Sequence, residues 1–115
     1  MNIDSSETCA QVAEQNMHLN GFGNREDIYI AADIFEILRA YRDQNWSFDV
    51  VILDPPKFAH NARQIKQASR GYKDINLLGM KLTKPGGILV TFSCSGTVSE
   101  DLFQKIIHVI YTKQK

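Results

Sequence analysis

The stretch "FDVVILDPPKF", residues 48–58, decides the fold of this chain. It is a nearly continuous apolar run that stops at Asp54 and is followed by Pro55 and Pro56. Runs of this kind are typical of strands buried on both faces of a parallel sheet. The strand therefore ends in a carboxylate, and the fixed φ of the two prolines makes the backbone after the strand rigid. A second run, "ILVTFSCSG" at residues 88–96, ends in the same manner on the thiol of Cys94.

Strand and helix patterns alternate along the rest of the chain. We expect a strand end at Ile3 and further strands at 28–32, 48–53 and 88–93, the last entered through a "KPGG" turn. The first helix is expected to begin at an Asp4–Glu7 capping box and to end at Leu19, with Gly21 as the residue that stops it. Further helices are expected at 34–41, at 72–82 and after Ser99, which would cap the last one. Such alternation predicts an α/β fold with one mostly parallel sheet of about four strands. Residues 57–74 remain as a long, basic, irregular segment.

Composition excludes several classes of protein. The 115 residues form one domain or part of one, and the 13 basic and 13 acidic side chains argue against a uniformly basic nucleic-acid binder. No apolar run approaches the ~20 residues that span a bilayer, so we expect no membrane contact. The start of the chain has no signal-peptide pattern, and the two cysteines have no metal-ligand spacing. A cytoplasmic protein with reduced thiols and no metal is predicted.

Four polar residues follow the strands, where parallel α/β sheets bind their ligands. They are Asp4, Asp33, Asp54 and Cys94. Taken alone, Asp4 is as readily a helix cap as a ligand-binding group, Asp33 is more typical of a cap, and Cys94 is more typical of a buried strand-end thiol. The serines and the glycine around Cys94 favour exposure instead, whereas Cys9, on a helical stripe, is expected in the core. Four such residues on one rim favour a functional site.

Several of these stretches resemble a known family. "DPPKF", "RGYKDIN", "KPGGILVTFSCSG" and "DLFQKII" are similar to the class I S-adenosylmethionine-dependent methyltransferases of ribosomal RNA. More closely, they resemble the bacterial large-subunit rRNA cytosine-5 methyltransferase I family, from Asp4 to about Ile110. The resemblance implies a partial Rossmann-like sheet with helices on both faces. The family's N-terminal glycine-rich cofactor loop, RNA-binding domains and last strands have no counterpart. Residues 1–115 are thus expected to be a fragment of the catalytic domain, inactive alone and able to self-associate through exposed sheet edges.

The resemblance also implies roles for individual residues. Asp4 would hold the ribose hydroxyls of S-adenosylmethionine, Asp33 its adenine amino group, and Asp54 would contact both the cofactor and the target base. Cys94 would be the nucleophile that adds to carbon 6 of cytosine and thereby activates carbon 5. Asp54 would stabilise that adduct by hydrogen bonds to the ring nitrogen and the amino group.

Contact with ribosomal RNA is expected from the segment that follows Asp54. The resemblance and the interleaving of basic with aromatic side chains assign this contact to Pro55, Pro56, Lys57, Phe58, Arg70 and Tyr72. His60, in the same segment, is expected to have no role.

Other functions remain open on the sequence. An amino-directed nucleic-acid methyltransferase also carries an acid-Pro-Pro motif, but prefers an aromatic residue where Lys57 stands, and it would leave Cys94 without a role. A non-catalytic assembly module is the third hypothesis. A nicotinamide-dependent enzyme, suggested by Asp4 alone, explains neither "DPPKF" nor "FSCSG".

Overall fold

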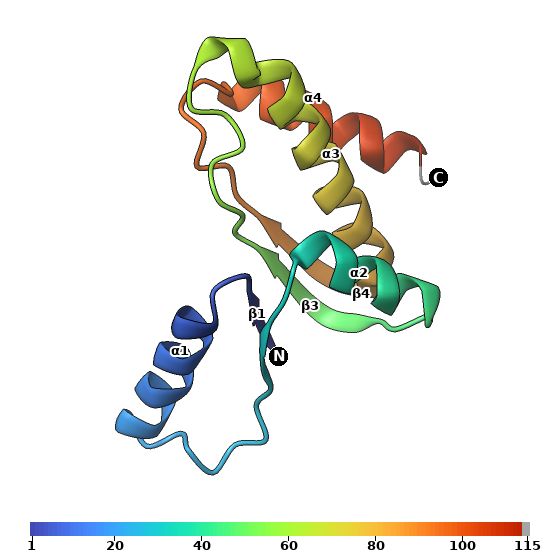
Figure 1. Ribbon diagram of the computed structural model, residues 1–115. Helices are drawn as coiled ribbons and strands as arrows, with labels where there is room; N and C mark the ends of the chain where they lie inside the picture. Colours follow the sequence, from blue (N-terminus) through green and yellow to red (C-terminus); the bar gives the residue numbers. More distant parts are fainter. Residues whose placement is uncertain (114–115) are drawn as a thin grey trace. The chain divides into compact units, whose positions relative to one another are not determined.

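The computed structural model describes residues 1–113, which form two compact units, residues 1–37 and the chain from Leu38 onward (Figure 1). Helix α2 (Ile34–Asp43) crosses the boundary between them. The first unit holds β1 (Asn2–Asp4), α1 (Glu7–Leu19) and β2 (Tyr29–Ala31). The second holds β3 (Phe48–Leu53), the 3-10 turn η1 (Ala62–Gln64), α3 (Ile65–Leu82), β4 (Thr83–Thr91) and α4 (Glu100–Lys113). The predicted alternation of strands and helices is confirmed.

The first unit is a strand–helix–strand motif. Strands β1 and β2 pair in parallel, with Asp4 opposite Ala31, and α1 connects them. The predicted helix end is confirmed, because Gly21 has φ +84° and the N–H of Phe22 donates to the carbonyl of Met17 at 2.8 Å. A left-handed residue at this position is the usual helix stop, and glycine adopts it at least cost.

Two expectations about the first helix are wrong. The N-cap of α1 is Ser6, whose Oγ accepts from the N–H of Cys9 at 3.2 Å, and not Asp4. Asp4 instead accepts from the N–H of Ser6 at 2.8 Å, because the chain needs two more residues to turn from strand to helix. Cys9 is exposed, since the stripe on which it lies buries no residue.

The second unit repeats the same motif with longer elements. Strands β3 and β4 pair in parallel, with Val50 opposite Ile88 and Leu53 opposite Thr91. "KPGG" is not a turn ahead of the strand but a bulge within it, since Phe48 pairs with Thr83. A Cβ on Gly87 would lie 2.7 Å from the carbonyl oxygen of Asp49, so the bulge brings two backbones closer than any side chain allows.

Helix α3 is seven residues longer than predicted. It begins at Ile65 and includes half of the segment expected to be irregular. The reason is visible in the burial, because Ala68, Tyr72 and Ile75 continue one apolar stripe at helical spacing toward the N-terminus. Helix α4 starts where expected, with the N–H of Leu102 donating to the Oγ of Ser99 at 3.1 Å.

The core of the second unit lies between α3, α4 and the loops that enter them. One cluster of buried residues there consists of Ala59, Ala68, Tyr72, Val98, Ile106 and Ile110. Helix α3 also contacts β3 and β4, and α4 packs on α3 (Figure 1).

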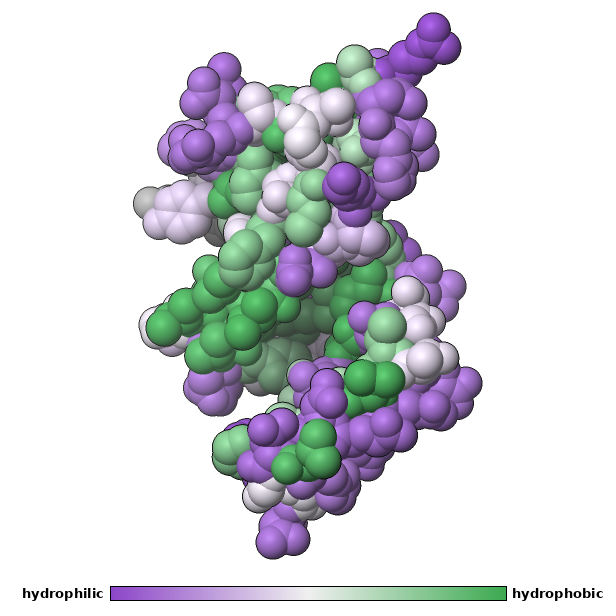
Figure 2. Space-filling view, turned by 90° about the vertical axis from the view of Figure 1, so that its left-hand side faces the viewer, coloured by the Kyte–Doolittle hydropathy of each residue, from purple (hydrophilic) through white to green (hydrophobic). Residues whose placement is uncertain are grey.

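The predicted α/β class with parallel strands is confirmed. The strands are hydrogen-bonded as two parallel pairs, β1–β2 in the first unit and β3–β4 in the second. Within residues 38–113, only one face of the β3–β4 pair is covered by a long helix, while Val50, Ile52 and Ile88 on the opposite face are more than half exposed. Figure 2 shows a broad apolar area, coloured green, on this side of the molecule. Alternation along the chain predicts parallel pairing but does not determine which strands become neighbours.

Candidate functional site

Asp54 and Cys94 lie together at the carboxyl ends of β3 and β4. Pairing continues past the end of β4, because the N–H of Phe92 donates to the carbonyl of Leu53 at 3.0 Å. The Cys94 thiol then donates to the Oδ1 of Asp54 at 3.7 Å. Both side chains are exposed. The structure thus brings together the two residues that the sequence analysis expected to act on one base.

A pocket lies beside the thiol. Its volume is about 430 Å³, which falls in the range of small-ligand sites. It is lined by the end of β4, by the turn that carries Cys94 and by the start of α4: Thr91, Phe92, Ser93, Cys94, Ser95, Gly96, Val98, Ser99, Glu100 and Phe103. The nucleophile candidate is therefore accessible to a molecule from solution.

A cluster of three hydroxyls connects the two strand-end loops, and the sequence analysis missed it. The Ser95 Oγ accepts from the N–H groups of Phe58 and Ala59 at 3.1 and 3.2 Å and lies 2.7 Å from the hydroxyl oxygen of Tyr72. The Ser93 Oγ donates to the same Tyr72 oxygen at 3.1 Å. The signal available in the sequence was the pair of serines flanking Cys94, but nothing there indicates their partner.

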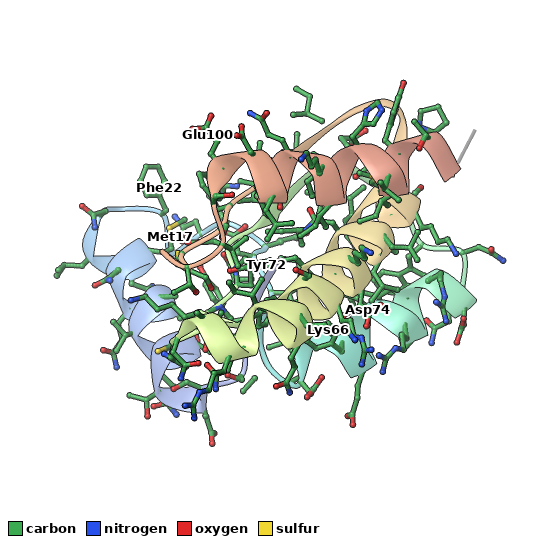
Figure 3. All side chains as sticks on the ribbon, turned by 90° about the horizontal axis from the view of Figure 1, so that it is seen from above. Met17, Phe22, Lys66, Tyr72, Asp74 and Glu100 are labelled. Carbon is green, nitrogen blue, oxygen red and sulfur yellow. The ribbon has the colours of Figure 1, made fainter. Side chains whose placement is uncertain are left out.

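Tyr72, which the sequence analysis assigned to RNA contact, lies in the core. Its side chain has 0% exposure. Figure 3 shows it in the interior between α3 and α4, with Lys66 and Asp74 of the same helix on the outer side. The cause is the extension of α3, which turns position 72 inward, so Tyr72 offers RNA no surface in this arrangement.

The other residues expected to contact RNA lie in the loop after Asp54, except for Arg70 on α3. Pro55 is buried and Pro56 and Lys57 are exposed. Phe58 is half-buried, with its ring edge-on to that of Tyr72 at 4.7 Å. Arg70 is exposed on α3. The loop therefore has a buried inner side and a polar outer side.

Asp4 and Asp33 lie at the carboxyl ends of β1 and β2 in the first unit. Each accepts one local backbone hydrogen bond through Oδ1: Asp4 from Ser6, and Asp33 from the N–H of Glu36 at 3.1 Å. Asp33 thus caps α2, as expected. Both carboxylates are exposed and occupy the same edge of one parallel pair. As acceptors they fit the hydroxyls of a ribose and the amino group of an adenine, which are donors.

The described part of the chain shows neither a metal-binding cluster nor a membrane helix. Among residues 1–113, no three His, Cys, Asp or Glu side chains lie close enough together to hold a metal ion. None of the helices described in that range is long and apolar enough to cross a bilayer.

Comparison with known proteins agrees with the resemblance seen in the motifs. No protein-family model matches the chain. A protein of Shewanella denitrificans named Ribosomal RNA large subunit methyltransferase I is 53% identical over 106 residues, which is 92% of this chain. Proteins of the same name from Klebsiella pneumoniae and Cronobacter sakazakii are 51% and 50% identical over 105 and 107 residues. The chain resembles one part of these rRNA methyltransferases.

The similarity covers only a portion of each relative. The chain spans 27% of the Shewanella denitrificans protein and 26% of the Klebsiella pneumoniae protein. The aligned residues make up more than nine-tenths of this chain, so both units contribute to the match.

Proposed function

We propose that this chain is part of a cytoplasmic enzyme domain that methylates carbon 5 of a cytosine in large-subunit ribosomal RNA. One observation carries the proposal: the thiol of Cys94 and the carboxylate of Asp54 lie 3.7 Å apart, at the ends of two paired strands. The pocket of about 430 Å³ beside Cys94 supports it. So does the identity of about half to proteins named as rRNA methyltransferases.

Cys94 provides the activation that carbon 5 requires, because this carbon is a poor nucleophile in cytosine. The cysteine sulfur forms a bond to carbon 6, which makes the ring an enamine and carbon 5 nucleophilic. After carbon 5 has gained the methyl group, it loses its proton to a base. The electron pair released reforms the ring double bond and breaks the sulfur–carbon bond, so Cys94 is freed.

Asp54 acts on the same ring. Its carboxylate accepts hydrogen bonds from the exocyclic amino group and from the ring nitrogen as the latter gains a proton in the adduct. Pro55 and Pro56 form the wall of the base site. Their fixed φ lowers the conformational entropy that the backbone would otherwise lose when the base binds. Lys57 and Phe58, which follow this wall in the chain, and Arg70 on α3 contact the RNA backbone and an unstacked base.

The first unit holds the nucleoside end of the cofactor in this proposal. Asp4 accepts from the ribose hydroxyls and Asp33 from the adenine amino group. Bound S-adenosylmethionine supplies an electrophilic methyl group. The chain's own residues orient the acceptor base and generate the nucleophile.

Trapping with 5-fluorocytosine RNA tests the proposal. A chimera in which this chain replaces the 106 matching residues of the Shewanella denitrificans relative supplies the remaining parts of the enzyme. Fluorine cannot leave as a proton, so the protein remains attached to the RNA through carbon 6. We expect a covalent adduct on a denaturing gel that disappears in Cys94→Ala. Cys9→Ala is the matched control, because Cys9 is the other exposed cysteine and the adduct should persist.

Each other outcome contradicts the proposal in a different way. Methyl transfer to unmodified RNA without an adduct, retained in Cys94→Ala, would identify an amino-directed methyltransferase. A folded chimera with neither adduct nor methyl transfer would identify the chain as a non-catalytic module.

A further inference from the structure

Tyr72 combines a fully buried ring with a hydroxyl that contacts the candidate site. Its ring has 0% exposure and is fixed on two sides, edge-on to Phe58 at 4.7 Å and to Phe103 at 5.4 Å. Its hydroxyl nevertheless lies within hydrogen-bonding distance of both serines that flank Cys94. A rigid ring therefore presents a polar atom to the turn that carries the nucleophile candidate.

The direction of the hydrogen bond between Ser95 and Tyr72 follows from counting lone pairs. The Ser95 oxygen has two lone pairs, and the N–H groups of Phe58 and Ala59 occupy both. Its one hydrogen is therefore donated to the Tyr72 oxygen, 2.7 Å away. Ser95 is 3% exposed, so water does not readily replace any of these partners.

These contacts join the two loops through the Ser95 hydroxyl, while the Tyr72 hydroxyl holds the Cys94 turn from the core side. Phe58 and Ala59 belong to the loop that leaves Asp54, whereas Ser93 and Ser95 bracket Cys94 in the sequence. Displacing either loop would break hydrogen bonds to buried groups, which is costly. The 3.7 Å separation of the Cys94 sulfur and the Asp54 oxygen is thereby restrained from both sides.

We propose that Tyr72 is a positioning residue, whose buried hydroxyl acts through Ser93 and Ser95 to fix the Cys94 thiol against the Asp54 carboxylate. This inference rests on the proposed function, in which the thiol and the carboxylate act on one base. Tyr72 touches neither the base nor the RNA. It determines the geometry of the groups that do.

A double-mutant cycle on thiol reactivity tests the inference without RNA or cofactor. The readout is the rate at which iodoacetamide alkylates Cys94 in the 115-residue chain, in a Cys9→Ser background that removes the other thiol. Asp54→Asn removes the negative charge beside the sulfur. We expect alkylation to accelerate about fivefold, the effect of one charge at about 4 Å in water. In a Tyr72→Phe background Ser93 and Ser95 lose their buried partner, so the Cys94 turn is held less firmly and the same substitution should change the rate less than about twofold.

Matched variants separate positioning from general stability. Tyr41→Phe removes a hydroxyl from a ring stacked on Trp46 at 4.4 Å, next to the start of β3 and away from both loops. It should leave the response to Asp54→Asn at about fivefold. Ser95→Ala should behave like Tyr72→Phe, and Ser95→Thr, which keeps the hydroxyl, should restore the response. A circular-dichroism melt confirms that each variant is folded, and the Ser95 pair decides the matter if Tyr72→Phe does not fold.

Two results would overturn the inference. An equal response to Asp54→Asn with Tyr72 and with Tyr72→Phe would show that the phenol does not control the distance. No response in either background would show that the thiol and the carboxylate are not held together. Failure of the proposed function is recognised separately, because Cys94→Ala would then retain methyl transfer whatever the alkylation rates are.

Discussion

The two units of this chain contain the same motif with very different interiors. In each, two parallel strands are joined by a helix, α1 in the first and α3 in the second. Helix α3 buries seven residues, while α1 buries none, and no residue between 1 and 37 is buried. A motif is thus stabilised by the apolar stripe of its helix and not by its hydrogen-bonding pattern, because the stripe is what removes apolar surface from water.

The largest expected difference comes from truncating a side chain in each helix. Leu82 on α3 is 1% exposed, whereas Val12 on α1 is 46% exposed. We expect Leu82→Ala to lower the free energy of unfolding by about 2–5 kcal/mol through lost burial and a residual cavity. Val12→Ala should change it by less than about 1 kcal/mol. Urea unfolding followed by circular dichroism measures both, and equal losses would contradict the contrast between the units.

A second prediction concerns the bulge in β4, for which the straight β1–β2 pairing has no equivalent. Gly87→Ala places a Cβ 2.7 Å from the carbonyl oxygen of Asp49 and 2.9 Å from that of Lys84. Backbone atoms cannot rotate away, so we expect a loss of about 1–3 kcal/mol, as for other overpacked sites. Gly96→Ala is the control, because a Cβ there meets nothing within 4 Å. A melting temperature unchanged by Gly87→Ala would mean that the bulge can relax.

The N-caps provide a matched pair with a smaller effect. Ser6 caps α1 and Ser99 caps α4, each through its Oγ. Replacing either by alanine costs its helix about 1 kcal/mol. Ser99→Ala should therefore lower the midpoint of the cooperative unfolding transition, because α4 packs in the core. Ser6→Ala should reduce only the helical circular-dichroism signal before that transition. If Ser6→Ala lowered the midpoint as much as Ser99→Ala does, the two units would unfold together.

The smallest effect is expected on the uncovered face of the second unit. Ile52 is 66% exposed on β3, so Ile52→Thr should alter the free energy of unfolding by less than about 0.5 kcal/mol. The same substitution should lower self-association, measured by analytical ultracentrifugation, if copies of the chain meet through this apolar surface. A stability loss as large as that of the neighbouring buried Leu53→Ala would show that the face is covered in solution.

Much of the local structure was predictable because local residues determine it. Gly21 and Ser99 mark a helix end and a helix start through backbone and hydroxyl chemistry that acts within a few residues. Apolar runs identified β3 and the second half of β4 for the same reason. The wrong predictions concern element boundaries: the start of α1 near Asp4, the start of α3 and the start of β4 at "KPGG". At each of these places a few residues are compatible with more than one local structure.

The candidate site was only partly predictable. Asp54 and Cys94 stand 40 residues apart, yet both were expected at one edge, since parallel strands deliver their ends to the same side. Tyr72 was expected to contact RNA and lies in the core, whereas Cys9 was expected in the core and is exposed. Exposure depends on which face of a helix meets another element, and this information is absent from a short stretch of sequence.

The sequence by itself determined the strand–helix alternation, the parallel pairing, the acid and the thiol at two strand ends and the resemblance to rRNA methyltransferases. Each of these depends on residue order and on local chemistry. The tertiary structure alone decided which strands pair within each unit, and that the Ser95 hydroxyl, bonded to the buried Tyr72 phenol, connects the Asp54 loop with the Cys94 turn. Those features arise from packing between segments far apart in the chain, where burial makes a few hydroxyl contacts specific.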